Sequence, residues 1–320
     1  MISKYGVWAE NSKGRAAPEE QDEVRTCFQR DVDRITHSKS FRRLKHKTQV
    51  FLQPEGDHYR TRLTHTLEVA RIARTISRAL ALNEDLTEAI GLGHDLGHTP
   101  FGHAGERALN EIYSCGFKHF EQSLRVVDRL EKSGAGLNLC YETRMGILNH
   151  TIGAPDDTAE ATTVRLSDKI AYINHDSDDA IRAGILTVSD IPPLVRERMG
   201  ERHSARIDTV IKDVVANSTE GKINMSAEMT EAVNVFYDYL YEKVYRNPKA
   251  KGEEAKVSNI LGAIWDFYVK KPEELPEDYK RIAQDEGIER AICDYVSGMT
   301  DDYAVFKFSN IYIPAAWQVK

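Results

Sequence analysis

Three histidines and a carboxylate lie within ten residues of this chain, in the run His94-Asp95-Leu96-Gly97-His98-Thr99-Pro100-Phe101-Gly102-His103. A single histidine at helical spacing is usually a core residue whose hydrogen bonds are satisfied. Burying several imidazoles beside a carboxylate is unfavourable unless these groups pair or bind a metal ion. Adjacent His94 and Asp95 point about 100° apart on a helix, so both reach one centre only at a helix end or between helices. A metal ion in the core of a helical bundle fits that requirement.

The residue types in this run restrict the metal without identifying it. Imidazole and carboxylate ligands suit a divalent ion of borderline or hard character, and thiolates are absent from the set. Mn, Mg, Fe and Zn therefore all stay open. His65 lies on an apolar helix face with Val69, Ile72 and Ile76. Taken alone, it is the kind of histidine that usually packs in a core.

A second polar set lies on a helix that is predicted to begin near Ala161. Four residues share one face of it at offsets of four, eight and eleven: Asp168, Tyr172, Asp176 and Asp179. Acidic stripes of this kind are commonly solvent-exposed faces. The flanking Arg165 and Lys169 favour instead a surface that meets phosphate, and a tyrosine among acids suits a wall that contacts a sugar.

Helical spacing recurs along the chain, whereas the alternation typical of strands is scarce. Asn83 followed by Glu84 and Asp85 has the pattern of a helix N-cap with acids in the first turn, and Gly97 and Pro100 must end that helix. The sequence predicts helices over residues 64–82, 84–94, 121–131, 161–184, 204–216, 225–245, 256–270 and 285–300. The predicted fold class is all-α.

Other segments lack this helical spacing. The Pro-containing stretch 191–193 and the turn formers at 247–252 predict breaks between helices. The first 20 residues are polar, and we expect them to be loose until they meet a partner. A short hairpin is expected only in the tail, over residues 305–317.

Composition and charge restrict the class of protein further. The four cysteines, Cys27, Cys115, Cys140 and Cys293, have no CxxC spacing, which argues against a zinc ribbon or a dithiol redox site. No stretch is apolar enough for a signal peptide or a membrane span, so we expect a cytoplasmic location and no membrane partner. Net charge is -7, yet residues 25–74 hold twelve Lys or Arg against five Asp or Glu. This excess indicates either an anionic ligand or a set of solvated helix faces.

The order of these residues resembles the H…HD…D signature of the HD superfamily, with His65, the doublet His94-Asp95 and Asp168 on successive helices. A longer match is more specific. The runs 62–65, 94–103 and 168–172, with Asp176 after them, resemble the deoxynucleoside triphosphate (dNTP) triphosphohydrolase branch, which includes bacterial dGTPases. The resemblance covers residues 29–185. It implies an HD-domain helical bundle with a C-terminal helical extension: a catalytic core with its N-terminal arm over residues 1–190, and a helical region packing on it over 191–320.

The resemblance also implies an activity and assigns its residues. The activity is metal-dependent hydrolysis of dGTP or several dNTPs at the α-phosphorus, which releases a deoxynucleoside and intact triphosphate. The implied metal ligands are His65, His94, Asp95 and Asp168. The implied catalytic residues are His98, His103 and Glu106, and the implied substrate contacts are Gln49, Arg62, His119, Lys169, Tyr172 and Asp176.

These assignments carry specific roles. His103 would donate a proton to the leaving 5'-oxygen while Glu106 orients it, and Gln49 would read the sugar 3'-hydroxyl. Tyr172 and Asp176 would pack against the deoxyribose and disfavour a 2'-hydroxyl. Members of this family form homo-oligomers, so the resemblance implies one here as well.

Other functions stay open. Another HD phosphohydrolase, such as a 5'-deoxynucleotidase, a phosphodiesterase or an alarmone hydrolase, would keep the metal ligands. It needs neither the Tyr172 and Asp176 wall nor the His98 and His103 pair. A nucleotide-sensing module would bind metal and nucleotide without turnover. Single-stranded nucleic acid is a weaker possibility, because the chain is acidic and its basic segment lacks interleaved aromatics.

Overall fold

The computed structural model describes residues 3–49, 59–247 and 252–315, which fold mainly into helices. No strand occurs in these three ranges, where pairing is limited to isolated bridges such as that of Arg15 with Cys140. The predicted all-α class is therefore confirmed. Nowhere in the same ranges is a helix both long and apolar enough to cross a membrane.

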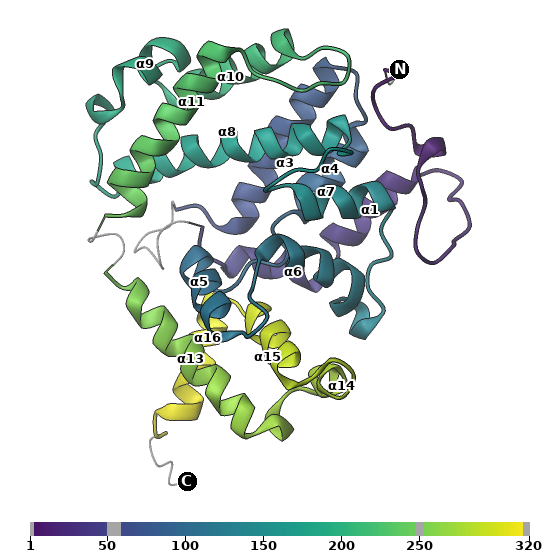
Figure 1. The fold of residues 1–320 in the computed structure, drawn as a ribbon, viewed down its shortest axis with the longest axis vertical. Helices are drawn as coiled ribbons and strands as arrows, with labels where there is room; N and C mark the ends of the chain where they lie inside the picture. Colours follow the sequence, from purple (N-terminus) through teal and green to yellow (C-terminus); the bar gives the residue numbers. More distant parts are fainter. Residues whose placement is uncertain (1–2, 50–58, 248–251, 316–320) are drawn as a thin grey trace.

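Three helices form the centre of the molecule: α3 (Arg62–Ala79), α4 (Glu84–Gly93) and α8 (Ala159–Arg182). Two more, α1 (Cys27–Thr36) and α7 (Tyr141–Asn149), pack against α4 (Figure 1). The side chains of Thr61, Asn83 and Thr158 accept hydrogen bonds from backbone N–H groups in the first turns of the three central helices. Such caps satisfy donors that the helix itself leaves unpaired, and they fix where each helix begins.

Apolar side chains of the central helices interlock in the largest core. Val69 and Ile76 of α3, Ile90 of α4, and Ile170 and Ile173 of α8 have no exposed surface. Burial of each such side chain stabilises the fold by about 1.5–3 kcal/mol. An outer layer covers α3 and α8: α9 (Pro193–Met199), α10 (His203–Asn217), α11 (Ala227–Leu240) and the π-helical turn η6 (Tyr241–Tyr245) (Figure 1).

A second core lies at the other end of the molecule. It joins α5 (Gly102–Ile112) to the C-terminal helices α13 (Glu254–Lys270), α14 (Glu277–Glu286), α15 (Ile288–Ser297) and α16 (Asp301–Tyr312). Leu109 packs there with the equally buried Leu261, Ile264 and Ile292. Helices from 191–320 thus pack on earlier helices at two separate places. The proposed division of the chain at residue 190 stays a prediction.

Short elements connect these layers. They are α2 (Lys39–Arg43), α6 (His119–Arg125), η1 (Ala9–Asn11), η2 (Leu44–His46), the π-helical η3 (Val126–Leu130), η4 (Lys132–Gly134), η5 (Val188–Asp190) and η7 (Pro272–Glu274). A third apolar cluster includes Leu44, Leu96 and Val127. It packs against the segment that follows α4, and so supports the run of histidines found in the sequence.

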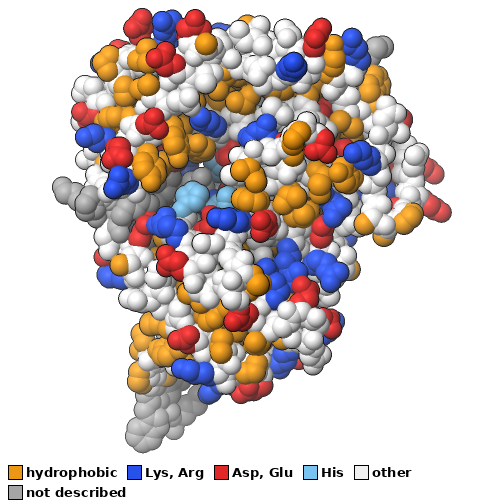
Figure 2. All heavy atoms as spheres, in the orientation of Figure 1, with side chains coloured by type: hydrophobic (Ala, Val, Ile, Leu, Met, Phe, Trp, Pro, Cys, Tyr) orange, Lys and Arg blue, Asp and Glu red, His pale blue; other side chains and the backbone are white. Residues whose placement is uncertain are grey.

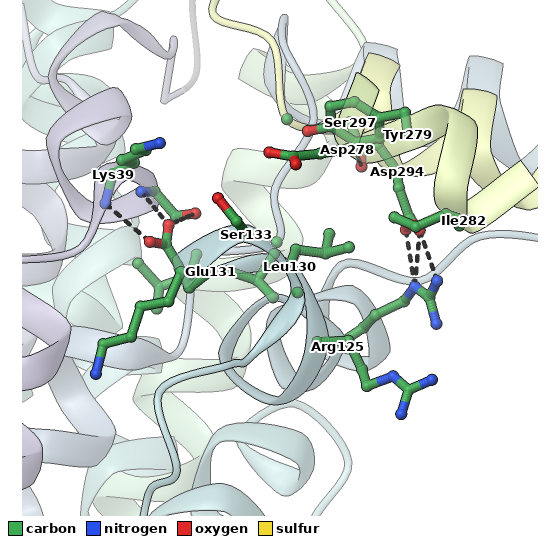
Figure 3. A pocket seen from close by; sticks show the side chains of 18 of the residues that line it. Lys39, Arg125, Leu130, Glu131, Ser133, Asp278, Tyr279, Ile282, Asp294 and Ser297 are labelled. Carbon is green, nitrogen blue, oxygen red and sulfur yellow. Dashed lines mark hydrogen bonds and ion pairs between the residues drawn. The ribbon is translucent and has the colours of Figure 1, made fainter. Parts of the chain in front are cut away.

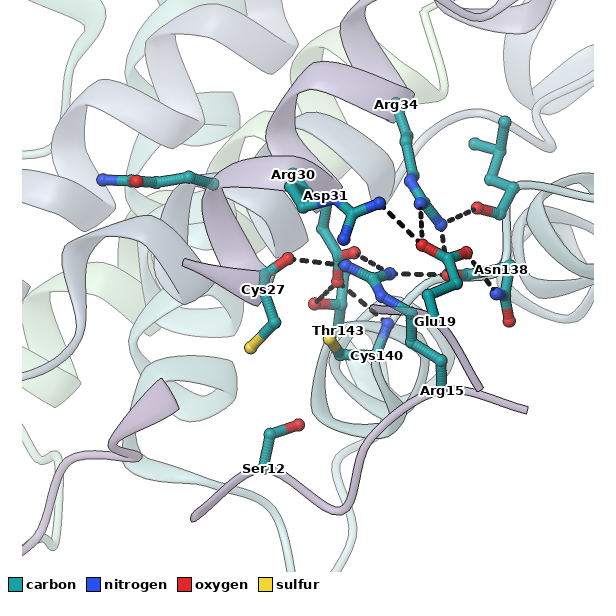
Figure 4. Close-up of polar contacts among 12 residues, drawn as sticks. Ser12, Arg15, Glu19, Cys27, Arg30, Asp31, Arg34, Asn138, Cys140 and Thr143 are labelled. Carbon is teal, nitrogen blue, oxygen red and sulfur yellow. Dashed lines mark hydrogen bonds and ion pairs between the residues drawn. The ribbon is translucent and has the colours of Figure 1, made fainter. Parts of the chain in front are cut away.

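The N-terminal segment is held against the core, so the prediction that it is loose is wrong. The backbone N–H of Val7 donates to Glu160 at 2.9 Å. Arg15 donates to the buried Asp31 and to the backbone carbonyls of Cys27 and Asn138 (Figure 4). These are buried or half-buried polar contacts, which order a segment that has few apolar side chains of its own.

The tail also differs from its prediction. Residues Asp301–Tyr312 form α16, capped by the Thr300 hydroxyl, which accepts from the N–H of Tyr303. The predicted hairpin is therefore wrong for the described part of the tail, and residues 316–317 lie outside the described residues. The predicted break at 247–252 also falls largely outside them, because positions 248–251 are not described.

Gly97 lets the backbone after α4 approach the backbone of α6 more closely than a residue with a Cβ atom would allow. A Cβ at this position would lie 2.1 Å from the backbone nitrogen of Ser123. We expect Gly97→Ala to lower the free energy of unfolding by about 1–3 kcal/mol, since α6 must shift. Gly262→Ala is the matched control: its Cβ would meet nothing closer than 3.9 Å inside α13, so it should stabilise by about 0.5–1 kcal/mol. Urea unfolding of both variants checks this; equal stabilities would refute the steric account.

Candidate metal centre and substrate cavity

A cavity of about 610 Å³ lies between the central helices, α5 and the end of α11. Its lining includes ten of the thirteen predicted site residues and several tyrosines: Gln49, Arg62, His65, Asp95, His98, His103, His119, Asp168, Tyr172, Asp176, Tyr237, Tyr241 and Tyr245. Histidine side chains are visible at the bottom of a hollow on this face of the molecule (Figure 2). The volume is in the range of sites for small molecules and nucleotides.

Four predicted metal ligands come together at the base of this cavity, where three of them line it and His94 lies just behind. His65 projects from α3, His94 caps the end of α4, Asp95 follows it, and Asp168 projects from α8. His65 Nε2 lies 3.1 Å from Asp168 Oδ1, and His94 Nε2 lies 3.6 Å from Asp95 Oδ1 and 3.9 Å from Asp168 Oδ1. Ligand atoms of His65, His94 and Asp95 all lie within 4.8 Å of one another. Because α4 ends at Gly93, the side chains of His94 and Asp95 can point to the same centre, which adjacent residues within a continuous helix cannot do.

The donor atoms of this group fit a divalent cation. His94 Nδ1 donates to the carbonyl of Gly91 at 2.7 Å, which leaves the lone pair of Nε2 facing two carboxylates. Nε2 is buried and has no hydrogen-bond partner. A lone pair against carboxylate oxygens is repulsive, and a cation between them removes the repulsion. Fixing the other ring nitrogen on a carbonyl is how metal-binding histidines are usually oriented.

Both carboxylates are ionised in this site. Burial alone would raise the pKa of Asp95, but the positive charge around it, which includes the guanidinium of Arg62, holds it well below its usual range. Burial likewise acts to raise the pKa of Asp168, whereas the hydrogen bond from His65 and the nearby His94 lower it to about 2. Ionised carboxylates next to imidazole nitrogens complete a mixed ligand set of the kind that Mn, Mg, Fe and Zn accept.

Arg62 places a positive charge beside Asp95, at the edge of the metal-ligand group and in the lining of the cavity. Its guanidinium donates to Asp95 at 2.8 Å, while its Nε and second terminal nitrogen are buried without partners. Gln49 also has a buried amide oxygen without a partner. Gly102, at φ +56°, lies so close that a Cβ there would be 3.2 Å from the Arg62 guanidinium. Unpaired buried donors of a guanidinium are costly unless an anion binds them.

A cluster of imidazoles lies beside Arg62. His98 stacks on His119 with ring centroids 4.1 Å apart, and His103 lies 5.4 Å from His98. Burial and Arg62 lower the pKa of His98 well below its usual value, so this ring is neutral. His103 is 65% exposed, and its Nδ1 lies 3.5 Å from Glu106. Of these rings, His103 is the one that is open to solvent and steadied by a carboxylate.

His150 joins the cluster although the sequence did not single it out. Its Nδ1 donates to the carbonyl of Ile147 at 2.8 Å, and its Nε2 lies 3.2 Å from His119 Nε2. Burial, with His94 and His119 nearby, lowers the pKa of His150 to about 3, so its Nε2 accepts. His119 must therefore donate from Nε2. A histidine directly after the end of a helix would have been the signal, but the sequence analysis predicted no helix over residues 141–149.

Glu106 completes this chain on the other side of His119. Its carboxylate accepts from the backbone N–H and from Nδ1 of His119, both at 2.9 Å. Burial acts to raise the pKa of Glu106, but the hydrogen bonds with His103 and His119 hold it well below its usual range. His119 is thus hydrogen-bonded at both ring nitrogens, to Glu106 and to His150. These contacts fix the orientation of its ring in the wall of the cavity.

Three residues of the stripe predicted on α8, Asp168, Tyr172 and Asp176, line the cavity, whereas the fourth, Asp179, accepts from Arg60 at 2.8 Å. Asp176 is buried and accepts from the hydroxyl of Tyr245, and its other oxygen has no partner. Burial raises the pKa of Asp176 to about 7. Tyr172 lies 6.1 Å from Tyr237, ring to ring, and burial raises its pKa too. These side chains form a wall with both apolar faces and hydrogen-bonding groups.

Three predicted residues do not appear in the cavity lining. His94 and Glu106 lie behind it, in contact with His150 and His119 respectively. Lys169 points elsewhere: its ammonium donates to Asn234 of α11 at 2.8 Å. The role of Lys169 in binding triphosphate stays a prediction.

The fold and the convergence of His65, His94-Asp95 and Asp168 define an HD-domain protein, and the HD domain family matches residues 62–173. The phosphohydrolase-associated domain family matches residues 223–310. A deoxyguanosinetriphosphate triphosphohydrolase-like protein of Caldanaerobacter subterraneus subsp. tengcongensis is 53% identical over 318 residues, which are 99% of this chain and 94% of that relative. A protein of the same name from Clostridium perfringens strain 13 is 49% identical over 98% of this chain and 94% of its own length. The chain belongs to this deoxyguanosinetriphosphate triphosphohydrolase-like family.

A solved structure shares the fold. It is a phosphohydrolase of Bacteroides thetaiotaomicron, similar with a TM-score of 0.51 at 15% sequence identity. The similarity covers 87% of this chain and 68% of that one.

Metal binding can be tested on the ligand set directly. We expect His94→Gln to weaken Mn binding by more than about 100-fold, because changes even to the partners of metal ligands weaken binding about 10–100-fold. His203→Gln is the matched control, since this ring stacks on His175 and lies outside the ligand set. Metal content after dialysis, measured by mass spectrometry, checks the prediction. Equal Mn in the two variants would remove His94 from the ligand set.

Proposed function

We propose that this protein is a dNTP triphosphohydrolase that hydrolyses dGTP or several dNTPs at the α-phosphorus. The observation that carries the proposal is the combination, in one cavity, of a buried cation-binding group with the unpaired donors of Arg62 and the doubly hydrogen-bonded His119. One end can activate a phosphoryl centre and the other can hold a chain of phosphates. The names of the relatives support a deoxynucleotide as substrate.

In this proposal the protein's own side chains bind and orient the triphosphate. Arg62 contacts the α-phosphate through the donors that Asp95 leaves free, and His119 meets phosphates further along the chain. Lys169 would balance the remaining charge if its side chain turned from Asn234. A divalent ion held by His65, His94, Asp95 and Asp168, with Mn or Mg as first candidates, would supply a water of lowered pKa and polarise a phosphoryl oxygen.

The leaving 5'-oxygen needs a proton, and His103 is the residue proposed to give it. Its ring is exposed to the cavity, and Glu106 lies within 3.5 Å to orient it. The neutral His98 lies beside it as a hydrogen-bonding partner for the α-phosphate. General acid catalysis of this kind contributes about 10²–10⁴-fold to the rate.

Discrimination of the sugar is proposed for the wall of the cavity. Tyr172 and the buried Asp176, which both line the cavity, would pack against the deoxyribose and disfavour a 2'-hydroxyl. The unpaired amide oxygen of Gln49 would accept from the 3'-hydroxyl. A homo-oligomer, expected from the family resemblance, is a further part of the proposal.

Two alternative functions would each leave some of the residues in the cavity without a role. A 5'-deoxynucleotidase or a phosphodiesterase would use the metal group and Arg62, but would have no triphosphate for His119 to meet. A nucleotide sensor would have no need of the exposed His103 next to an ionised Glu106. The full set is used only in triphosphate release, which is why we favour it.

Product analysis tests the proposed reaction. Protein loaded with Mn or Mg is incubated with each dNTP, alone and in mixtures, and the products are resolved by ion-exchange chromatography. We expect deoxynucleoside and intact triphosphate, because the bond broken joins the α-phosphorus to the 5'-oxygen. Pyrophosphate with deoxynucleoside monophosphate, or no cleavage of any dNTP, would contradict the proposal.

A variant separates the chemical step from binding. His103→Ala should keep the metal and the nucleotide while turnover falls by about 10²–10⁴-fold, the range for loss of a general acid. The fall should appear in kcat, with little change in the dissociation constant for the nucleotide. If the variant turns over substrate at the parent rate, His103 is not the proton donor.

A further inference from the structure

The C-terminal helices contact two segments of the substrate cavity through one buried carboxylate. Asp301, the first residue of α16, is 3% exposed. Its side chain accepts from the backbone N–H of Phe101 at 2.8 Å, from the backbone N–H of Thr48 at 3.0 Å and from the hydroxyl of Thr48. Gln49 follows Thr48 in the chain, and His103 comes two residues after Phe101. We propose that Asp301 is a positioning residue of the substrate cavity, which places the amide of Gln49 and the imidazole of His103 for the nucleotide.

Three donors meet the two side-chain oxygens of Asp301. Oδ1 accepts from Phe101, and Oδ2 accepts from both donors of Thr48. An ionised carboxylate accepts at both oxygens and donates nothing, so it suits three donors. An asparagine would bring an NH2 group to one of these positions, and an alanine would leave the donors without this partner. Because a buried unpaired N–H group is unfavourable, the bonds to Asp301 restrain both segments.

Phe101 needs such a restraint because its backbone conformation is uncommon. Its φ is +63°, in the left-handed region that residues with a side chain rarely adopt. Phe101 is the N-cap of α5, its side chain makes no capping hydrogen bond, and its ring packs in the second core. The bond to Asp301 therefore helps to hold the residue from which α5 starts, and His103 lies in the first turn of that helix.

The segment of Thr48 and Gln49 crosses the start of α5 at close range. A Cβ on Gly102 would lie 3.3 Å from the carbonyl oxygen of Gln49 and 3.4 Å from that of Thr48. Thr48 also pairs with Thr61 in an isolated bridge, directly before Arg62. One carboxylate thus binds both segments near the point where they cross.

The start of α16 is itself anchored. It follows α15, whose buried Asp294 accepts from Arg125 of α6 at 2.7 and 2.9 Å beside the pocket drawn in Figure 3. Ser297, the last residue of α15, accepts through its carbonyl from the ammonium of the buried Lys47 at 2.9 Å. The same ammonium donates to the backbone carbonyl of His98. These contacts fix the carboxylate at the start of α16 relative to α6 and to the segment that carries His98.

This arrangement would affect two different properties of the proposed reaction. The buried, unpaired amide oxygen of Gln49 is the proposed acceptor for the 3'-hydroxyl, so its position affects which sugar binds. His103 is the proposed proton donor, so its position affects the rate of the chemical step. A misplacement of about 1 Å can slow an enzyme about 10²-fold. Both effects rest on the proposed function, whereas the bonds from Asp301 to the two segments do not.

The restraint is measured first, in protein without nucleotide. The variant is Asp301→Ala, and the matched control is Asp302→Ala, which removes the same charge from the first turn of α16 at an exposed position. Amide hydrogen exchange is followed by mass spectrometry. We expect exchange at Thr48 and over residues 98–103 to be at least about fivefold faster in Asp301→Ala, while α3 and α8 exchange as in the parent. Equal exchange in variant, control and parent would overturn the proposal.

A second variant applies if Asp301→Ala does not fold. Asp301→Asn keeps the volume and one acceptor oxygen, but its NH2 group meets a donor. We expect exchange at the same residues to be at least about twofold faster than in the parent. An Asp301→Asn protein with the exchange of the parent would show that the carboxylate serves folding alone, which is incompatible with the proposal.

Discrimination of the sugar is measured second, as the ratio of kcat/KM for dGTP to that for 2',3'-dideoxyguanosine triphosphate in Mn. This ratio does not change when a variant only lowers the fraction of folded protein. We expect the parent and Asp302→Ala to favour dGTP by at least about tenfold, because a site that hydrogen-bonds a hydroxyl rejects the analogue without it. Asp301→Ala should favour dGTP by less than about threefold, with kcat for dGTP lowered about 10–100-fold.

The outcomes separate the parts of the inference. An unchanged ratio would overturn the role of Asp301 in placing Gln49, and an unchanged kcat would overturn its role in placing His103. If no dNTP is hydrolysed at all, the proposed function fails, while hydrogen exchange still decides whether Asp301 holds the two segments.

Discussion

His94 Nε2 is buried and faces two ionised carboxylates, those of the buried Asp95 and the half-buried Asp168, and this contact sets the rest of the arrangement. The other ring nitrogen is committed to the Gly91 carbonyl, so Nε2 cannot relieve the repulsion by donating a proton of the neutral ring. Asp95 and Asp168 do not readily relieve it by taking protons, because Arg62 donates to Asp95 and the hydrogen bond from His65 lowers the pKa of Asp168. A cation is the simple solution, and the fold brings the ligands together where one would bind.

The surrounding structure serves this cluster. Helices α3, α4 and α8 pack together in the largest core. The backbone positions of His65, His94 and Asp168 are therefore fixed. Arg62 then holds Asp95 from the substrate side and keeps two donor groups unpaired. Each of these buried charged groups would be unfavourable alone. They are compatible because each lies next to an opposite charge or next to a position where an oppositely charged ligand could bind. The proposed binding of an anion that bears several charges rests on this arrangement.

The sequence predicted the chemical part of the site better than the elements that surround it. The doublet His94-Asp95 at a helix end and the stripe of Asp168, Tyr172 and Asp176 were visible as spacing, and the structure brings them to one cavity. The stripe's own pattern left a solvent face equally open, because periodicity reports which residues share a face and not what covers it. Here η6 covers it, through Tyr245.

What the sequence missed depends on contacts between distant segments. His150 meets His119 across 31 residues, and neither helix α5 nor α7 was predicted, since each is rich in glycine or polar residues. The N-terminal segment lacks apolar spacing and is ordered by Arg15 and Glu160 instead, which no local pattern reveals. The tail was mistaken for a hairpin because its aromatic residues also suit strands, whereas the Thr300 cap and two following acids begin a helix.

The most direct test of the central claim is a crystal of the protein soaked in Mn, with anomalous scattering measured at the Mn absorption edge. One strong peak within about 2–2.3 Å of His65, His94, Asp95 and Asp168 is expected, since Mn takes nitrogen and oxygen ligands at such distances. A peak elsewhere, or a site in which His94 Nε2 has acquired a hydrogen-bond donor in place of the ion, would contradict the account.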